Sequence, residues 1–184
     1  DYTESFSKNV VDNFIDMYAQ GLTPNPCVEC NRSVKFDHFL NQAKKLNCEK
    51  VATGHYAKII KNENFYELHK ADYLDKDQSY VLHMLKSKDL ENILFPLGEI
   101  TKPEVRQIAA RLGLKTAFKK DSQDICFVGK KDYRSFVEKR IDLTSAGEIF
   151  DVNGIKVGNH NGIHQFTVGQ RKGLPGGQAT PRYV

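Results

Sequence analysis

Two groups of cysteines carry most of the chemistry that this chain could perform. Cys27 and Cys30 form a Cys-x-x-Cys pair after the segment Pro24-Asn25-Pro26, and Cys126 lies far downstream in the segment 120–129. Each proline fixes its own φ angle and restricts the residue before it, so the backbone beside the pair is expected to be rigid. A rigid backbone next to a thiol favours a sulfur atom held for chemistry. The sequence therefore indicates a site that handles sulfur.

The Cys-x-x-Cys pair is open to other interpretations. Structural zinc usually needs a second ligand pair at similar spacing, and the chain offers only Cys48, Cys126 and scattered histidines. A thioredoxin-like redox pair would lie at the start of a helix, whereas we expect this pair in a loop between two helices. The two cysteines could also be incidental loop residues. For a reactive thiol, Arg32 and the start of a helix at Val34 would favour the thiolate of Cys30.

Two further segments could bind a ligand. Gly54 and His55 end a short apolar strand, where ligands bind in open α/β sheets, and glycine allows close approach to the backbone. A strand-end turn with a partly exposed histidine is an equal interpretation. In Lys76-Asp77-Gln78 the lysine could contact phosphate and the glutamine a base edge. Capping of a helix over 78–85 by Asp77 or Ser79 is the more common use of such residues.

The elements that must position these residues follow an α/β pattern. From apolar spacing, helices are expected over 5–20, 34–46, 78–85, 103–112 and 132–140. Strands are expected over 50–55, 56–60, 65–71, 148–151 and 155–157. Helix followed by a short buried strand is typical of α/β proteins, and we expect a domain boundary near Gly129.

Composition limits the class of protein. The chain has 184 residues, 40% of them hydrophobic, and no apolar run approaches the roughly 20 residues of a membrane span. Four cysteines without a secretion signal fit a reducing compartment, so we expect a cytoplasmic protein with no membrane partner. The net charge of +4 permits a phosphate-bearing partner without requiring one.

Taken in order, these segments resemble the tRNA-specific 2-thiouridylases. The resemblance is carried by Gly21 to Pro26, Cys30-Asn31, Lys35-Phe36, 52–56, 76–80, 95–98, 120–122, 125–127 and 167–174. It implies an α/β fold in two parts. Residues 1–129 would be the C-terminal portion of a Rossmann-like ATP-pyrophosphatase domain of the adenine nucleotide alpha-hydrolase class. Residues 130–184 would form a small mixed α+β domain, the central tRNA-binding domain.

The resemblance also implies a sulfurtransferase. Such an enzyme uses ATP with Mg²⁺ to adenylate the oxygen at C2 of the wobble uridine and then transfers persulfide sulfur to C2, giving 2-thiouridine, AMP and pyrophosphate. An amide-like oxygen is a poor leaving group until it is activated, and a persulfide is a strong nucleophile at neutral pH. The implied partners are the anticodon loop of tRNA and a cysteine desulfurase or sulfur-relay protein.

Residue roles carry over by position. Cys126 resembles the persulfide carrier, and Cys30 the partner thiol that frees sulfide or closes a transient Cys30–Cys126 disulfide. Gly54 would approach the nucleotide. The other matching residues would contact the target base or the tRNA, the base being flipped out of its stack; they are Asn25, Pro26, Cys27, His55, Lys76, Asp77 and Gln78.

Two departures from the family pattern leave alternatives open. Some members have aspartate, a proposed acid or base, where this chain has Cys27, and Cys27, Cys30 and Cys126 could instead hold a [4Fe–4S] cluster with one open iron site. The family's Ser-Gly-Gly-x-Asp-Ser pyrophosphate loop and C-terminal β-barrel do not occur in these 184 residues, so we expect the chain alone to be inactive. An alternative of a different class is a noncatalytic, metal-binding module that binds tRNA.

Overall fold

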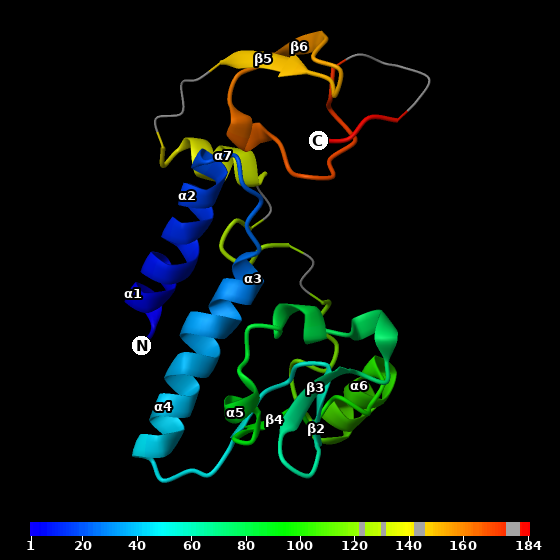
Figure 1. Cartoon of the computed structure of the whole chain (residues 1–184). Coiled ribbons are helices and arrows are strands. Elements are labelled where there is room, and N and C mark those ends of the chain that lie inside the picture. Colours follow the sequence, from blue (N-terminus) through cyan, green and yellow to red (C-terminus); the bar gives the residue numbers. More distant parts are fainter. Residues whose placement is uncertain (122–123, 130–131, 142–145, 176–180) are drawn as a thin grey trace. The chain divides into compact units, whose positions relative to one another are not determined.

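The chain forms two compact units. The computed structural model describes residues 1–121, 124–129, 132–141, 146–175 and 181–184 (Figure 1). Unit 1 consists of Asp1–Asn9 and Cys27–Gln123, and unit 2 consists of Val10–Pro26 and Asp124–Val184.

The first helical segment confirms the helix expected over 5–20. It runs through α1 (Thr3–Phe6), π-helical turns over Ser7–Asp12 and α2 (Asn13–Ala19). Its apolar residues recur every three or four positions, which gathers them on one buried face; they include Val10, Phe14, Ile15 and Tyr18. Gly21 follows with a φ of 73°, a left-handed conformation that glycine adopts without steric cost and that ends the helix.

The second helical segment corrects the expected position of the cysteine pair. α3 (Pro26–Glu29), π-helical turns over Cys30–Phe36 and α4 (Asp37–Lys45) follow one another without a break (Figure 1). The helix therefore begins at Pro26 rather than Val34, and the prediction of a loop around Cys27 and Cys30 was wrong. Proline is favoured in the first turn of a helix because its missing N–H would be unsatisfied there, and asparagine is a preferred residue just before it.

Unit 1 contains two small sheets. β1 (Val51–Ala52) pairs in parallel with β4 (Ile93–Leu94), and β2 (Ala57–Lys61) pairs antiparallel with β3 (Tyr66–Lys70). The hairpin between β2 and β3 was predicted, whereas the strand expected over 50–55 has only two residues. Both sheets surround a buried apolar cluster, which comprises Phe36, Ala57, Val81, Leu82, Ile93 and Phe95.

The helix expected over 78–85 does not form. Short 3₁₀ turns over Leu74–Lys76 and Ser79–Val81 stand there, and α5 (Ser87–Leu90) follows. Side chains of this segment bond to backbone groups elsewhere, which competes with helix formation. α6 (Lys102–Arg111) confirms the helix expected from Pro103, and it starts with a capping box between Thr101 and Glu104.

Unit 2 packs α2 against a shorter helix. α7 (Tyr133–Glu138) begins after Asp132, whose carboxylate accepts the backbone N–H of Arg134. β5 (Gly147–Phe150) and β6 (Lys156–His160) form the expected antiparallel hairpin, and a 3₁₀ turn covers Ile163–Gln165. Across the described parts of both units, no helix has the length and apolar character needed to cross a membrane.

Candidate active site

Cys27 and Cys30 lie in the first turns of the helix that begins at Pro26. Residues three apart on a helix are neighbours on its surface, so both thiols belong to one face. Cys27 is exposed and Cys30 is half-buried. Backbone N–H groups at a helix start favour negative charge, thiolate included. The pair therefore has the helix-start position of a reactive thiol, although helix α2 and not a strand lies before it in the chain.

Asn31 connects this helix to the segment around Val81 by a hydrogen bond. Its side chain is 3% exposed, and its Nδ2 donates to the carbonyl oxygen of Val81 at 3.0 Å. The side-chain Oδ1 is also buried and has no hydrogen-bond partner among the described residues. Burial of an amide is costly unless it is hydrogen-bonded, so Asn31 specifies how the cysteine-bearing helix meets this segment.

His55 is buried and neutral. It is 8% exposed, and its ring centroid lies 5.9 Å from those of Phe36 and Phe95. Burial, and secondly the Lys35 ammonium, lowers the pKa of His55 to about 4. The interpretation of His55 as a partly exposed strand-end residue was therefore wrong, because the rings around it close over the imidazole.

The neighbours of His55 fix its tautomer. Lys35 Nζ lies 3.5 Å from His55 Nε2, and Thr53 Oγ1 lies 2.8 Å from Nδ1. An ammonium group can only donate, so Nε2 accepts from Lys35 and Nδ1 carries the hydrogen of the neutral ring. That hydrogen is donated to Thr53 Oγ1. The imidazole thereby holds Lys35 and the end of β1 in one arrangement.

Gln78 and Asp77 act on backbone groups. Gln78 Oε1 accepts the N–H of Tyr56 at 3.0 Å, and the Gln78 N–H donates to the Tyr56 carbonyl at 2.8 Å. Asp77 accepts the N–H of Ala71 at 2.8 Å and the hydroxyl of Ser79 at 2.7 Å. The prediction that Asp77 or Ser79 caps a helix was wrong, because no helix begins here. Contact of Asp77 and Gln78 with tRNA stays a prediction.

We call the set Asn31, His55 and Gln78 the buried corner; Asn31 and His55 are buried and Gln78 is half-buried. These residues come from three segments far apart in the sequence, and all belong to unit 1. Through them the cysteine-bearing helix, the Gly54-His55 turn and the 76–81 segment are held by side-chain hydrogen bonds to neighbouring groups. The structure thus brings together, within one unit, the candidates Cys27, Cys30, Gly54, His55, Lys76, Asp77 and Gln78.

Gly54 has room for a larger side chain. A Cβ built there would meet only Leu97 Cδ1, at 3.6 Å, which is an ordinary contact. At Gly98 the same atom would overlap the carbonyl oxygen of Ala57 and lie 2.7 Å from Lys58 Cγ. Packing inside unit 1 therefore requires glycine at Gly98 but not at Gly54, and the role of Gly54 toward a nucleotide stays a prediction.

Cys126 is exposed on a turn anchored by its neighbours. Backbone N–H groups of Val128 and Gly129 both donate to the carbonyl of Ile125. The ring of Phe127 packs edge-on against Phe14 at 5.3 Å, within the core of unit 2. The apolar residues on either side of Cys126, Ile125 and Phe127, are thus partly buried against this core, while Cys126 is exposed.

The pairing of Cys30 with Cys126 stays a prediction, because the two residues belong to different units. Asn25 and Pro26 likewise belong to unit 2 and Cys27 to unit 1. All four cysteines of the chain fall within the described ranges and are thiols, not disulfides.

The described residues contain no group of three or more His, Cys, Asp or Glu side chains placed to hold a metal ion. Within unit 1, Cys27 and Cys30 supply two thiolates, one short of the three that the iron–sulfur alternative needs. Cys126, the third cysteine of that alternative, belongs to unit 2, so an iron–sulfur cluster held by the three cysteines stays a prediction.

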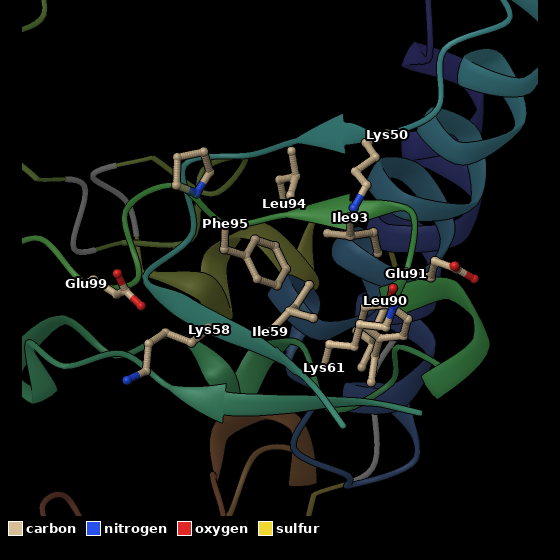
Figure 2. Close-up of a pocket in the computed structure, with 12 residues that line it drawn as sticks. Lys50, Lys58, Ile59, Lys61, Leu90, Glu91, Ile93, Leu94, Phe95 and Glu99 are labelled. Atoms are coloured by element: carbon tan, nitrogen blue, oxygen red, sulfur yellow. The ribbon is translucent and has the colours of Figure 1, made fainter. Parts of the chain in front are cut away.

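A separate hollow of about 300 Å³ lies beside β2 and β4 in unit 1 (Figure 2). Its apolar lining includes Ile59, Ile93 and Phe95, and its charged residues include Lys58 and Glu99. None of the site residues predicted from the sequence lines it. The hollow is thus a feature apart from the buried corner.

Comparison with known proteins decides the family. The model described as tRNA methyl transferase HUP domain matches residues 1–130, and that described as tRNA methyl transferase PRC-barrel domain matches residues 134–184. The chain belongs to this family. Its α/β class, a HUP domain followed by a small barrel-like domain, is confirmed. The family description names methyl transfer, whereas curated relatives are named for thiolation.

Relatives named tRNA-specific 2-thiouridylase MnmA match the whole chain. The protein of Chloroflexus aurantiacus (strain J-10-fl) is 49% identical, that of Chloroflexus aggregans 48% and that of Rickettsia peacockii 46%, each over 100% of this chain. The chain covers 52%, 52% and 51% of their lengths, so it spans about half of the curated relatives that it matches. The resemblance to tRNA-specific 2-thiouridylases is confirmed.

Sequence reasoning missed several polar residues within the part matched by the HUP domain. Asn31 was noted only as a neighbour of Cys30, and its burial has no periodic signal. Lys102 and Arg106 stand four residues apart on α6, where a shared face is predictable. Their common partner Asp121 is distant in sequence, so only the fold brings the three together.

Proposed function

We propose that the complete protein carrying this chain is a tRNA 2-thiouridylase, a cytoplasmic sulfurtransferase that acts on the wobble uridine. The supporting observation is the identity of 46–49% over the whole chain to proteins of that name. The geometry agrees with sulfur chemistry, since one candidate thiol lies near a helix start and the other faces outward on an anchored turn. Both arrangements suit thiols that must react with other molecules.

In the proposed reaction, ATP with Mg²⁺ first adenylates the oxygen at C2 of the uracil ring. A persulfide on Cys126, loaded by a cysteine desulfurase or relay protein, then attacks C2 through its terminal sulfur. The new C–S bond replaces the C–O bond, and AMP leaves with the oxygen and its electron pair. Activation is essential because an amide-like oxygen does not leave unaided.

Cys30 completes the transfer. Its thiolate attacks Sγ of Cys126, the bond from Sγ to the transferred sulfur breaks, and that electron pair stays on the base as 2-thiouridine. Alternatively the Cys30 thiolate attacks Sγ before the persulfide reaches the base, which breaks the S–S bond of the persulfide and frees its terminal sulfur as sulfide, and this sulfide then attacks C2. Either course leaves a Cys30–Cys126 disulfide, which an external dithiol must reduce with two electrons before the next persulfide is loaded.

The other candidates would bind and orient the substrates. Gly54 has the free space that close approach of a nucleotide needs. Asn25, Pro26 and Cys27 would line the flipped base, and flipping costs least in a single-stranded anticodon loop. Lys76 would contact tRNA phosphate. Asp77, Gln78 and His55 would act on the tRNA mainly by holding the backbone that meets it, since their polar atoms bond to protein groups.

The decisive experiment changes one sulfur in the complete protein. Cys126→Ser should abolish 2-thiouridine, measured by mass spectrometry of tRNA nucleosides, because serine cannot carry a persulfide. Affinity for tRNA should change by less than about twofold, since phosphate contacts dominate it. Cys48→Ser is the matched control, because Cys48 is also an exposed thiol, and it should leave thiolation unchanged. Continued thiolation by the Cys126→Ser protein would refute the proposal.

A further inference from the structure

Three cations of unit 1 converge on one carboxylate. Lys76 Nζ lies 2.9 Å from Asp121 Oδ2, while Lys102 Nζ and Arg106 Nη2 lie 3.3 Å and 3.6 Å from Oδ1. We call these four residues the Asp121 cluster. Lys102 and Arg106 are four residues apart on α6 and so share a face, and Lys76 joins them from the segment after β3. The cluster has two positive charges in excess.

The cluster faces solvent. The side chains of Lys76, Lys102 and Arg106 are 42%, 28% and 45% exposed, and that of Asp121 is 31% exposed. Ion pairs this accessible contribute little to stability, typically less than about 1 kcal/mol each. Hydrogen bonds from Lys76 and Lys102 lower the pKa of Asp121, so its carboxylate is charged at neutral pH. The three cations repel one another, and their weak ion pairs add little to the stability of the fold. A gain in folding stability therefore does not explain why they lie so close together.

The buried ring of Tyr56 contacts the cluster through Lys102. Tyr56 is 4% exposed, and Lys102 Nζ lies 5.4 Å from the centroid of its ring, a cation–π contact. Its hydroxyl is buried and has no hydrogen-bond partner among the described residues. Because this hydroxyl is enclosed, Tyr56 contributes to the cluster through the face of its ring, which contacts Lys102.

We propose that the Asp121 cluster binds a phosphodiester of the RNA backbone, and that Asp121 occupies the place of that phosphate in the free protein. The inference rests on the proposed function for the identity of the RNA as tRNA. A carboxylate engaged through both oxygens by lysine and arginine offers the same charge and acceptor pattern as a phosphate. The surface is open and so cannot enclose a small anion, which favours a polyanion whose many phosphates bind together.

The test is the salt dependence of RNA affinity in the complete protein. The probe is a labelled anticodon stem-loop, followed by fluorescence anisotropy over a series of KCl concentrations. Lys102→Gln and Arg106→Gln should each weaken binding about fivefold near 0.1 M salt and reduce the log–log salt slope by about 0.7, the loss of one phosphate contact. The matched control is Lys88→Gln, an exposed lysine of α5, which should change neither quantity.

Asp121→Asn separates the proposal from a purely structural role. Removal of the internal competitor should tighten RNA binding several-fold, whereas loss of a structural anchor would weaken it and would overturn the proposal. The tightening should be smaller when Lys102→Gln is added, because Asp121 then competes with the RNA for two cations instead of three. Far-ultraviolet circular dichroism of each variant checks that the fold is kept.

Two arms distinguish the source of the phosphate. ATP and inorganic phosphate should bind equally well to the parent and to the Lys102→Gln variant. Loss of ATP affinity with unchanged RNA affinity would overturn assignment to the RNA backbone. If the parent binds the RNA with the expected variant effects but never thiolates it, the proposed function fails while the phosphate site stands.

Discussion

Two parts of unit 1 use polar side chains in opposite ways. In the buried corner, Asn31, His55 and Gln78 each form a hydrogen bond with a backbone or side-chain group of the protein. In the Asp121 cluster, the long side chains of Lys76, Lys102 and Arg106 reach solvent around one shared carboxylate. The corner is neutral, and the cluster has an excess of positive charge.

This difference in burial suggests different roles: the corner positions parts of the protein, and the cluster binds a ligand. Burial makes the hydrogen bonds made by Asn31 and His55 costly to lose, because a polar group left unpaired there costs its desolvation energy. Exposure makes the ion pairs of the cluster weak and exchangeable, so a ligand can replace them at little cost. We infer that the corner fixes where the cysteine-bearing helix and the Gly54 turn lie, while the cluster contributes to holding RNA.

The largest expected effect tests which backbone around the corner is rigidly packed. Gly98→Ala should destabilise unit 1 by about 3 kcal/mol or more, because its Cβ would overlap the Ala57 carbonyl oxygen and force a backbone shift. Gly54→Ala should change the free energy of unfolding by less than about 1 kcal/mol, since its Cβ has room and its backbone needs no left-handed conformation. Urea denaturation followed by tyrosine fluorescence measures both.

The same two substitutions also test the nucleotide-binding role proposed for Gly54. Gly54→Ala should keep the fold but weaken ATP binding if the open space there receives a nucleotide. Equal destabilisation by both substitutions would contradict the distinction between framework and open space. It would mean that the Gly54 turn is packed as tightly as the backbone at Ala57.

The next effect is the pH dependence of the corner. The unfolded chain protonates His55 near pH 6.5, whereas the folded chain does so only near pH 4. Between these values the unfolded state binds more protons, so stability falls as the pH is lowered and levels off below about 4. The full contribution is about 3 kcal/mol at about 1.4 kcal/mol per pH unit.

His55→Gln isolates that contribution. The variant cannot titrate at this position, so its free energy of unfolding, measured by urea melts over this pH range, should decrease less on acidification than that of the parent. The control is His83→Gln, which removes an exposed histidine and should retain the parent slope. Parallel curves for the parent and His55→Gln would show that the ring is not held neutral by burial.

The periodic elements could be predicted from the sequence, and the reason is local. Apolar spacing and Gly21 located the first helix, and Pro103 with the apolar spacing after it located α6. Hairpin β2–β3 followed from two apolar runs joined by a polar turn. Each of these elements depends on residues only a few positions apart, so their information is present in one window of sequence.

The failures depend on contacts between distant segments. Gln78 lies in a non-helical segment because it pairs with Tyr56, and His55 is buried because Phe36 and Phe95 cover it. Neither partner is visible from spacing. The start of the cysteine-bearing helix was different, because Asn25-Pro26 is itself a local signal for a helix N-terminus. There, this local signal outweighs the loop-forming tendency of the nearby prolines.

The smallest expected effect concerns an ion pair on the cysteine-bearing helix itself. Arg32 bonds Glu29 through two nitrogens, at 2.6 Å and 3.1 Å, one turn apart on the helix. The Arg32 side chain is 48% exposed, so despite this geometry a double-mutant cycle of Arg32→Gln and Glu29→Gln should give a coupling of less than about 0.5 kcal/mol. The coupling should shrink further in high salt, since exposed charges are screened.

A coupling above about 1 kcal/mol would make this exposed pair as strong as a hydrogen bond of the buried corner. Solvent exposure would then fail as the property that distinguishes the two parts of unit 1, and the exchangeability inferred for the Asp121 cluster would fail with it.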